Sequence, residues 1–187
     1  PAGPAHEPNE DIAYMRSLCG IEILSPAQSD VAAAMVDITL NEPKLRYIRL
    51  ERSHPAVLNN VYSSEDLNKA FFEKGLSPIT QEANGVCILS SGYMLGRALE
   101  VAEKLNNAAV IDVFKIKPLN KEALKGIIQP YKVLVTLEEQ TLSGGFGSAI
   151  CEELADLCIH KPILRLGLPE GYIFDNGSRE HLLDTHG

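Results

Sequence analysis

Residues 131–150, which read YKVLVTLEEQTLSGGFGSAI, decide the fold class because they pass from a strand through a tight turn into a helix. The apolar, β-branched run over 133–137 predicts a strand that is covered on both faces. The glycines that follow it permit a sharp turn, with Ser143 as the expected N-cap of the next helix. That helix has an apolar stripe, formed by Ala149, Ile150, Leu154 and Leu157.

The same strand, loop and helix unit recurs on both sides of this stretch. The expected strands lie at 86–89, 109–114 and 162–166, and the expected helices lie at 93–105, 120–128 and from 177 onward. Alternating strands and helices predict an α/β domain with a mostly parallel, doubly wound sheet and right-handed crossovers.

The first 54 residues carry a shorter alternation of the same kind, which predicts the tail of a second α/β domain. Helices are expected from about residue 9 to Gly20 and from Ser25-Pro26 to about residue 40, and strands at 21–24 and 45–50. Residues 55–81 are less periodic, with one strand expected near 70–73. The predicted division is therefore 1–54, a connection over 55–81, and a second domain over 82–187.

Composition narrows the classes of function. The 187 residues are 45% hydrophobic and 22% charged, with a net charge of -8, which argues against a broad nucleic-acid surface. No apolar run is long enough to span a membrane, and no signal peptide is visible. The loop-like start PAGPAHEP, without a Met, suggests a fragment, a processed product or only the ordered part of a longer protein.

The four cysteines show no CxxC spacing. Cys19 and Cys87 are isolated, and Cys151 and Cys158 lie seven residues apart, on one face of the expected helix. Packed thiols in a reducing compartment are preferred over disulfides or a metal site, so a cytoplasmic location is expected.

Candidate ligand-binding side chains stand where strands end. Arg49 and Arg52 follow an expected parallel strand, the edge at which open α/β sheets bind ligands, and a guanidinium suits a phosphate or carboxylate. The alternative is an interdomain salt bridge. His6, in a proline-bounded loop, is either a solvated side chain or an imidazole held toward a pocket, and His54 is a weaker candidate.

The glutamates and glycines of the opening stretch allow more than one interpretation. Glu138 and Glu139 stand at a strand's carboxyl end, where facing opposite sides favours capping the loop or reaching across an interface over acid–base work. The turn over 144–147 matches neither GxGxxG nor GxxxxGK[ST]. Close packing of a helix N-terminus against another surface is therefore preferred to phosphate binding.

Several segments together resemble the transketolase family. Residues 3–13, GPAHEPNEDIA, are similar to its G-P-T-H-Q-P-x-E-D-x-A motif, with alanine and glutamate in place of threonine and glutamine. Further matches, in the same order along the chain, are YIRLER at 47–52, SSGYM at 90–94, VIDVFKIKPL at 110–119, VTLEEQ at 135–140, GGFGSA at 144–149 and GLP at 167–169.

This resemblance implies a layout and two site residues. Residues 1–54 would end a thiamine pyrimidine-binding domain, and 82–187 would form the transketolase C-terminal domain. His6 matches the histidine that touches donor hydroxyls, and Arg52 matches the arginine that contacts the sugar phosphate. Thiamine diphosphate and magnesium would serve the complete enzyme, and none is expected to bind this chain alone, because the family's cofactor-binding motifs belong upstream of Pro1.

The resemblance also implies function and partners. The first hypothesis is that the chain is part of a transketolase, which moves a two-carbon ketol unit between sugar phosphates. The enzyme would work as a homodimer or with a paired N-terminal subunit, and this chain alone would be inactive. The alternatives are deoxyxylulose-phosphate synthase, a 2-oxo-acid dehydrogenase β subunit, or a non-catalytic dimerisation or regulatory module. Neither nucleic acid nor membrane is an expected partner.

Overall fold

The computed structural model describes residues 8–51, 58, 61–81, 85–105 and 108–186. Their strands are β1 (Glu22–Leu24), β2 (Arg46–Ile48), β3 (Ser77–Thr80), β4 (Val86–Ser90), β5 (Ala108–Asp112), β6 (Lys115–Lys117), β7 (Val133–Thr141) and β8 (Ile163–Leu168). Their helices are α1 (Asp11–Ser17), α2 (Ser29–Asn41), α3 (Lys69–Lys74), α4 (Met94–Leu105), α5 (Lys121–Ile128), α6 (Phe146–Asp156) and α7 (Arg179–His186).

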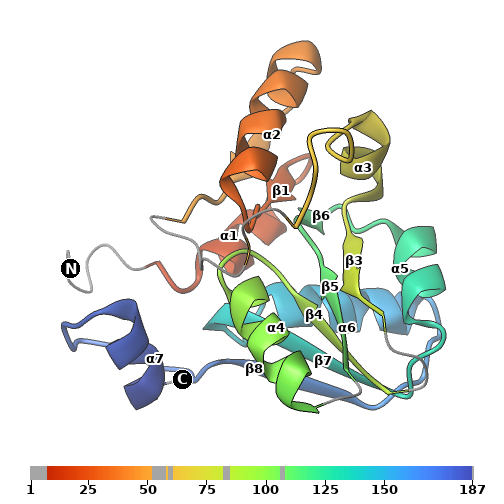
Figure 1. The fold of residues 1–187 in the computed structure, drawn as a ribbon. Helices are drawn as coiled ribbons and strands as arrows, with labels where there is room; N and C mark the ends of the chain where they lie inside the picture. The colour runs from red at the N-terminus through yellow and green to blue at the C-terminus, as the bar shows by residue number, and fades with distance from the viewer. Residues whose placement is uncertain (1–7, 52–57, 59–60, 82–84, 106–107, 187) are drawn as a thin grey trace.

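The larger sheet has the strand order β3-β5-β4-β7-β8. Four of its strands are parallel, and β3 pairs with β5 in the antiparallel sense. Helix α4 packs on one face, while α5 and α6 pack on the other (Figure 1). This arrangement confirms the predicted doubly wound α/β sheet, and the central strands β4 and β5 are buried on both faces as parallel strands require.

The order of the strands fixes where a ligand edge would lie. From β4 the chain runs through α4 to β5 on one side, and then through α5 to β7 on the other. The carboxyl ends of β4 and β7 therefore form the topological switch point, the position at which doubly wound sheets bind ligands.

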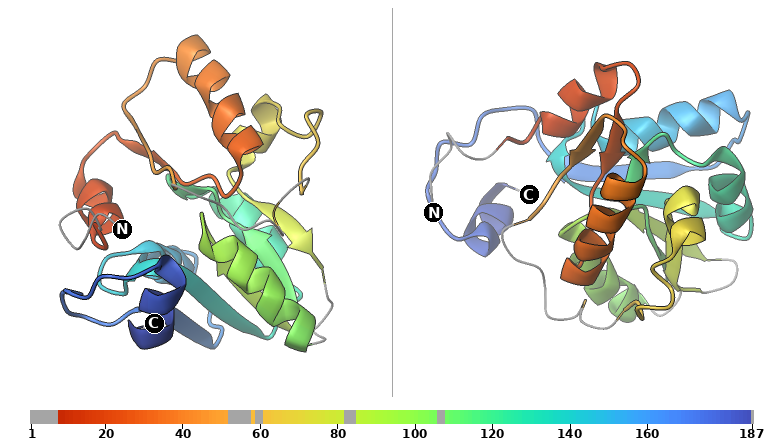
Figure 2. Two further views of the ribbon diagram at one scale, coloured as in Figure 1. Left: turned by 60° about the vertical axis from the view of Figure 1, so that its left-hand side comes forward. Right: turned by 90° about the horizontal axis from the view of Figure 1, so that it is seen from above.

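The segment before residue 50 forms a small sheet with the order β2-β1-β6, in which β1 and β2 are parallel. Strand β6 leaves the end of β5 and pairs with β1 in the antiparallel sense. Ile12, Ile21 and Ile23 join the buried cluster on the α5–α6 face of the larger sheet. The two parts thus share one continuous core, with α2 projecting from it (Figure 2). The division into two domains stays a prediction.

Residues 69–74 form helix α3, so the strand expected near 70–73 is wrong. The Asn68 side chain accepts a hydrogen bond from Phe71 N at 3.1 Å, and Gly75 ends the helix with a φ of 75°. Phe71 and Phe72 then pack against the Phe114 ring, with centroid distances of 4.4 and 5.8 Å. The strand of this region is β3, which extends the larger sheet by pairing with β5.

Helix α2 begins at Ser29, later than the Ser25-Pro26 start that the sequence suggests. Ser25 N donates to Phe114 O at 2.8 Å, which holds the residues after β1 against the start of β6. Ser25 and Gln28 are buried, and Gln28 is extended at φ -131° and ψ 152°. Tertiary contacts therefore override the local preference of Pro26 for the first helical turn.

All four cysteines are free, which agrees with the expectation of thiols rather than disulfides. Cys87 is buried, and burial raises the pKa of its thiol to about 12. Cys19 and Cys158 are exposed, so the expectation that they pack inside is wrong. Among the described residues, no helix is long and apolar enough to cross a membrane.

Candidate functional site

His6 and Arg52, which the resemblance assigns to the substrate, lie outside the described residues, as does His54. Their roles stay predictions. The described residues next to them show the surroundings: α1 begins at Asp11, three residues after Pro8, and Arg49 to Glu51 follow β2. Both segments meet the carboxyl edge of the larger sheet, where Thr141 N donates to Asn9 O at 3.0 Å.

Arg49 is engaged in ion pairs at this edge. Its Nε lies 3.0 Å from Asp11 Oδ2, and its Nη1 pairs with Glu51. Tyr47 donates its hydroxyl to the same Asp11 oxygen at 2.7 Å, and burial raises the pKa of Tyr47 to about 12. Of the two readings for Arg49, the structure supports the salt bridge, because two carboxylates already neutralise its guanidinium.

Glu138 caps helix α6. Its side chain turns back from β7, so that Oε2 accepts from Phe146 N at 2.6 Å and Oε1 accepts from Gly147 N at 2.8 Å. The expected N-cap, Ser143, is wrong: the helix starts after Gly145, whose own side chain offers no acceptor, and Glu138 satisfies the orphan N–H groups instead.

The glycines of the turn are required by this cap. A Cβ on Gly145 would lie 2.3 Å from Glu138 Oε2, and one on Gly147 would lie 2.6 Å from Thr136 Oγ1. Gly144 has a φ of +76°, and a Cβ there would lie 3.0 Å from the Cβ of Ala13. The turn therefore packs closely against another surface, as expected, and that surface is α1 of the same chain.

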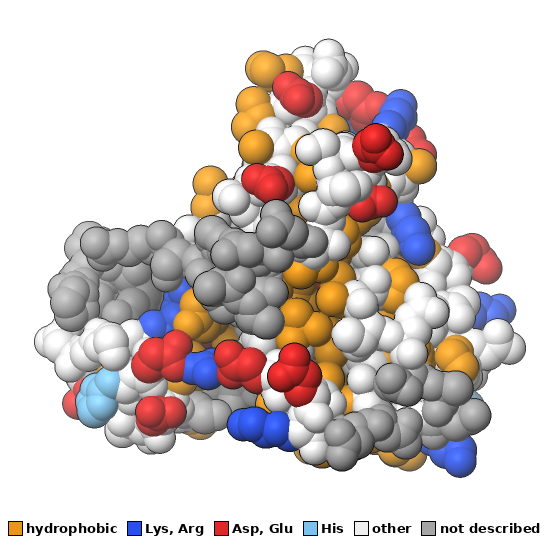
Figure 3. Space-filling model, in the orientation of Figure 1, with side chains coloured by type: hydrophobic (Ala, Val, Ile, Leu, Met, Phe, Trp, Pro, Cys, Tyr) orange, Lys and Arg blue, Asp and Glu red, His pale blue; other side chains and the backbone are white. Residues whose placement is uncertain are grey.

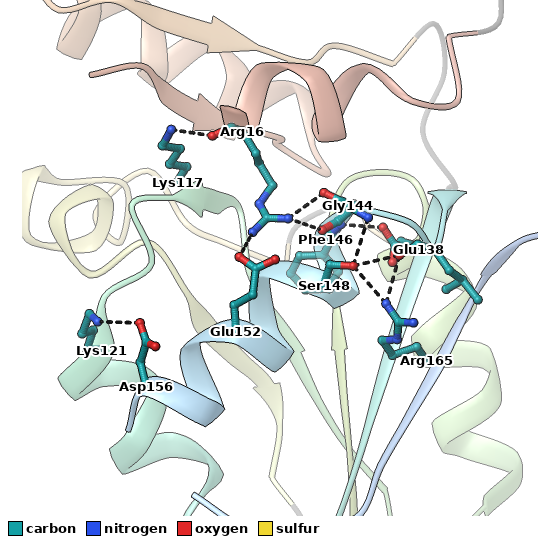
Figure 4. Close-up of polar contacts among 12 residues, drawn as sticks. Arg16, Lys117, Lys121, Glu138, Gly144, Phe146, Ser148, Glu152, Asp156 and Arg165 are labelled. Carbon is teal, nitrogen blue, oxygen red and sulfur yellow. Dashed lines mark hydrogen bonds and ion pairs between the residues drawn. The ribbon is translucent and has the colours of Figure 1, made fainter. Parts of the chain in front are cut away.

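Arginines hold the outer side of the turn (Figure 4). Arg165 Nη1, from β8, donates to Leu142 O and to Ser148 Oγ, both at 2.9 Å. Arg16 Nη1, from α1, donates to Gly144 O at 2.6 Å, and its Nη2 pairs with Glu152 on α6. These contacts fasten the first part of the chain to the α6 turn.

Burial and the neighbouring donors shift the pKa of Glu138 in opposite directions. Burial raises the pKa of Glu138 to about 7, against the lowering effect of the two backbone N–H groups and of Arg165 and Arg16. The N-terminus of α6 is thus already occupied by a carboxyl group of the chain itself. A phosphate would have to displace Glu138 to reach those N–H groups, which supports structural packing over phosphate binding at this turn.

Glu139 points to a different partner, as expected for neighbouring residues of a strand. Its Oε1 lies 2.9 Å from Arg179 Nε on α7, and Arg179 Nη2 lies 2.5 Å from Glu51 Oε2. The Arg179 guanidinium stands 4.1 Å from the centre of the Tyr93 ring, which follows β4. Helix α7 therefore covers the switch point between β4 and β7, a role that its sequence did not signal.

The described residues do not supply a site for a metal ion. Within residues 8–51, 58, 61–81, 85–105 and 108–186, no three His, Cys, Asp or Glu side chains gather closely enough to hold one.

Comparisons with known proteins agree on one family. The family described as "Transketolase, C-terminal domain" matches residues 75–187. The 1-deoxy-D-xylulose-5-phosphate synthase of Mannheimia succiniciproducens is 32% identical over 180 residues, covering 96% of this chain. The same-named protein of Nitrosococcus oceani is 31% identical over 187 residues, covering 98% of this chain. The chain spans 28% of the length of each of these relatives.

A solved structure is similar over nearly the whole chain. It is described as "Split gene transketolase, inactive beta4 tetramer" and is 29% identical, with a TM-score of 0.80. The similarity covers 97% of this chain and 57% of that one. It therefore includes the small sheet as well as the family-matched region.

Proposed function

The chain belongs to the transketolase C-terminal domain family, and from this premise we propose that it is the C-terminal section of a thiamine diphosphate-dependent transferase that builds or rearranges sugar phosphates. The observation that carries this proposal is the length of the similarity. It covers 96% and 98% of this chain in the two curated relatives and 97% in the solved structure, so it extends beyond residues 75–187 to the part of the chain that forms the small sheet.

The proposed roles of His6 and Arg52 are to orient donor hydroxyls and to hold the substrate phosphate. Arg49, the neighbouring arginine, is neutralised by Asp11 and Glu51, so Arg49 is a poor candidate for binding an anion at the end of this strand. A planar guanidinium matches phosphate with two parallel hydrogen bonds. In the complete enzyme, thiamine diphosphate would supply the carbanion chemistry.

Substitution of Arg52 in the complete enzyme tests this role. We expect Arg52→Ala to raise KM for a phosphorylated substrate roughly tenfold or more, because a charge-assisted pair is lost, while an unphosphorylated analogue is affected little. Lys125→Ala, at an exposed position of α5, is the control and should leave both KM values unchanged. Equal losses for both substrates in Arg52→Ala would contradict phosphate binding by Arg52.

Two reactions of the group are distinguished by their donors. The names of the curated relatives support deoxyxylulose-phosphate synthesis, whereas the name of the solved structure supports ketol transfer. Pyruvate consumption with release of carbon dioxide would assign the first, and product formation from a ketose phosphate donor would assign the second. The assay is run on the complete enzyme with one donor at a time.

We propose further that the chain works in an assembly. The similar solved structure is described as a split-gene transketolase and as an inactive tetramer. Light scattering of this chain, alone and with a candidate N-terminal partner, tests the proposal. A monomer under both conditions would count against the paired-subunit and the dimerisation readings together.

A further inference from the structure

A cavity of about 230 Å³ lies where α2 rises from the small sheet, away from the switch point. We call this cavity the α2 pocket. Its inner end is formed by residues of β1, β2 and β6, and α3 closes the opposite side. Apolar side chains line much of it, namely Leu24, Ala34, Ile38, Leu67 and Phe72. None of these residues takes part in the substrate roles proposed above.

Two buried cations stand at the inner end of the α2 pocket. The side chain of Arg46 is 3% exposed and that of Lys115 is 12% exposed. Both face Glu22: Arg46 Nε lies 2.5 Å from Glu22 Oε2, and Lys115 Nζ lies 3.5 Å from Glu22 Oε1. Two positive charges thus share one carboxylate, and the inner end of the pocket carries a net charge of about +1.

These cations have hydrogen-bonding capacity left over. Arg46 Nη1 donates to Glu42 O at 2.6 Å, but no described residue accepts a hydrogen bond from Arg46 Nη2. Within the described part of the chain, no acceptor is within hydrogen-bond geometry of the Lys115 ammonium, which has three protons to donate. Neither Arg46 Nη2 nor Lys115 Nζ is a buried atom without a partner, so both donors are open to an acceptor that enters the pocket.

The mouth of the pocket carries three carboxylates and two lysines, a net charge of about -1. Glu42 pairs with Lys69 at 2.7 Å and with Lys44 at 3.5 Å, and Asp37 and Glu73 also line the rim. Figure 3 shows acidic and basic side chains side by side over α3 and the adjacent end of α2. A doubly charged ligand would meet these acids without further compensation, whereas one negative charge balances the inner end.

We propose that the α2 pocket binds a small monocarboxylate with an apolar body, such as a short aliphatic or aromatic acid. The carboxylate bridges Lys115 and the free edge of Arg46, and the apolar body lies against Ile38 and Phe72. The pocket volume limits the ligand to about ten non-hydrogen atoms, for which a dissociation constant of roughly millimolar order is expected. The site is independent of the thiamine chemistry proposed for the complete enzyme.

Titration of the isotope-labelled chain with benzoate, followed by amide chemical shifts, tests this site. We expect saturable shifts confined to β1, β2, β6, α2 and α3. Benzamide, which keeps the shape without the charge, and inorganic phosphate are the comparison ligands, and both should bind at least about tenfold more weakly. Equal binding of benzamide, or shifts located elsewhere, would overturn the proposal.

Substitutions make the test specific. Lys115→Met keeps the apolar stem and removes the charge, so it should weaken benzoate binding about tenfold. Lys132 is an exposed lysine directly before β7, so Lys132→Met is the matched control and should leave binding unchanged. Should Lys115→Met fail to fold, Ala34→Phe fills the pocket from α2 and should abolish binding. Unchanged benzoate affinity in a folded pocket variant would overturn the proposal.

Discussion

Helices α6 and α7 both meet the carboxyl edge of the larger sheet, but they are held there by different forces. Helix α6 buries an apolar side, formed by Phe146, Ala149, Ile150 and Leu154, and its first turn is capped by the buried Glu138. Helix α7 has no buried residue. It is held by the ion pairs of Arg179 with Glu51 and Glu139, and by Tyr93, whose hydroxyl donates to Glu180 at 2.7 Å.

The comparison shows that α6 belongs to the buried core of the domain, whereas α7 is attached to its surface by polar contacts. Burial of apolar side chains contributes roughly 1.5–3 kcal/mol for each large residue, whereas an exposed ion pair contributes about 0–1 kcal/mol. Helix α6 should therefore open only when the whole domain unfolds, and α7 should detach on its own. Since α7 covers the end of β4, its detachment would uncover the switch point.

The strongest test of the framework removes the α6 cap. Glu138→Ala leaves two buried N–H groups without acceptors, and we expect the free energy of unfolding to fall by about 4 kcal/mol. Urea denaturation at pH 6 measures it. Glu152→Ala, which removes an exposed carboxylate from the same helix, is the control and should cost less than about 1 kcal/mol. Similar losses of unfolding free energy in both variants would contradict the claim that the buried cap stabilises the domain more than the surface ion pair.

The pH dependence of Glu138→Gln sharpens the same point. Because burial raises the pKa of Glu138 to about 7 from 4.5, the folded state holds its proton more tightly than the unfolded chain. The stabilisation by this group is complete below pH 4.5 and is lost as the pH rises through 7. From pH 5 to pH 8 the stability of the wild type relative to Glu138→Gln should fall by about 2–3 kcal/mol. A constant difference would contradict the raised pKa.

A smaller loss of stability is expected when the close packing at the turn is disturbed. Gly147→Ala places a methyl group 2.6 Å from Thr136 Oγ1 and 2.8 Å from Glu138 Oε1, so we expect a loss of about 2 kcal/mol. Gly126→Ala is the matched control, because a Cβ there meets nothing within 4 Å and α5 gains helix propensity. Thermal unfolding should rank Gly126→Ala above the wild type and Gly147→Ala below it.

The smallest effect on global stability is expected at α7. Arg179→Met should lower the free energy of unfolding by less than about 1 kcal/mol, yet it should accelerate amide exchange within α7. Raising the salt concentration from about 0.05 M to about 0.5 M should also accelerate this exchange in the wild type, because α7 is held in addition by the more exposed Arg97–Glu180 pair, which salt screens. The amides of α6 serve as the internal reference. Equal salt sensitivity in both helices would contradict the comparison.

The same contrast explains what the sequence predicts and what it does not. The larger sheet and helices α4, α5 and α6 follow from strong local periodicity, and Asn120 caps α5 as local rules suggest, accepting from Ala123 N at 3.0 Å. Capping of the loop is among the roles expected for Glu138 and Glu139, but the sequence assigns the N-cap of α6 to Ser143, because Glu138 lies eight residues before Phe146 and only the folded turn brings them together.

Other misses had signals that were available. Asn68 before Lys69 and Gly75 after Lys74 are the N-cap and C-cap residues of α3, although six residues are too few for a clear apolar period. Strand β6 and the late start of α2 depend on tertiary pairing with β1 and with Phe114, which no local pattern encodes. The substrate roles of His6 and Arg52 stay predictions.

The central claim is that this chain is one section of a transketolase-group enzyme and needs another section for catalysis. The most direct measurement assays the purified chain alone, with thiamine diphosphate and magnesium, for ketol transfer and for carbon dioxide release from pyruvate. The account predicts no product, and it predicts that activity appears when a complementary section is added. Turnover by this chain alone would contradict it.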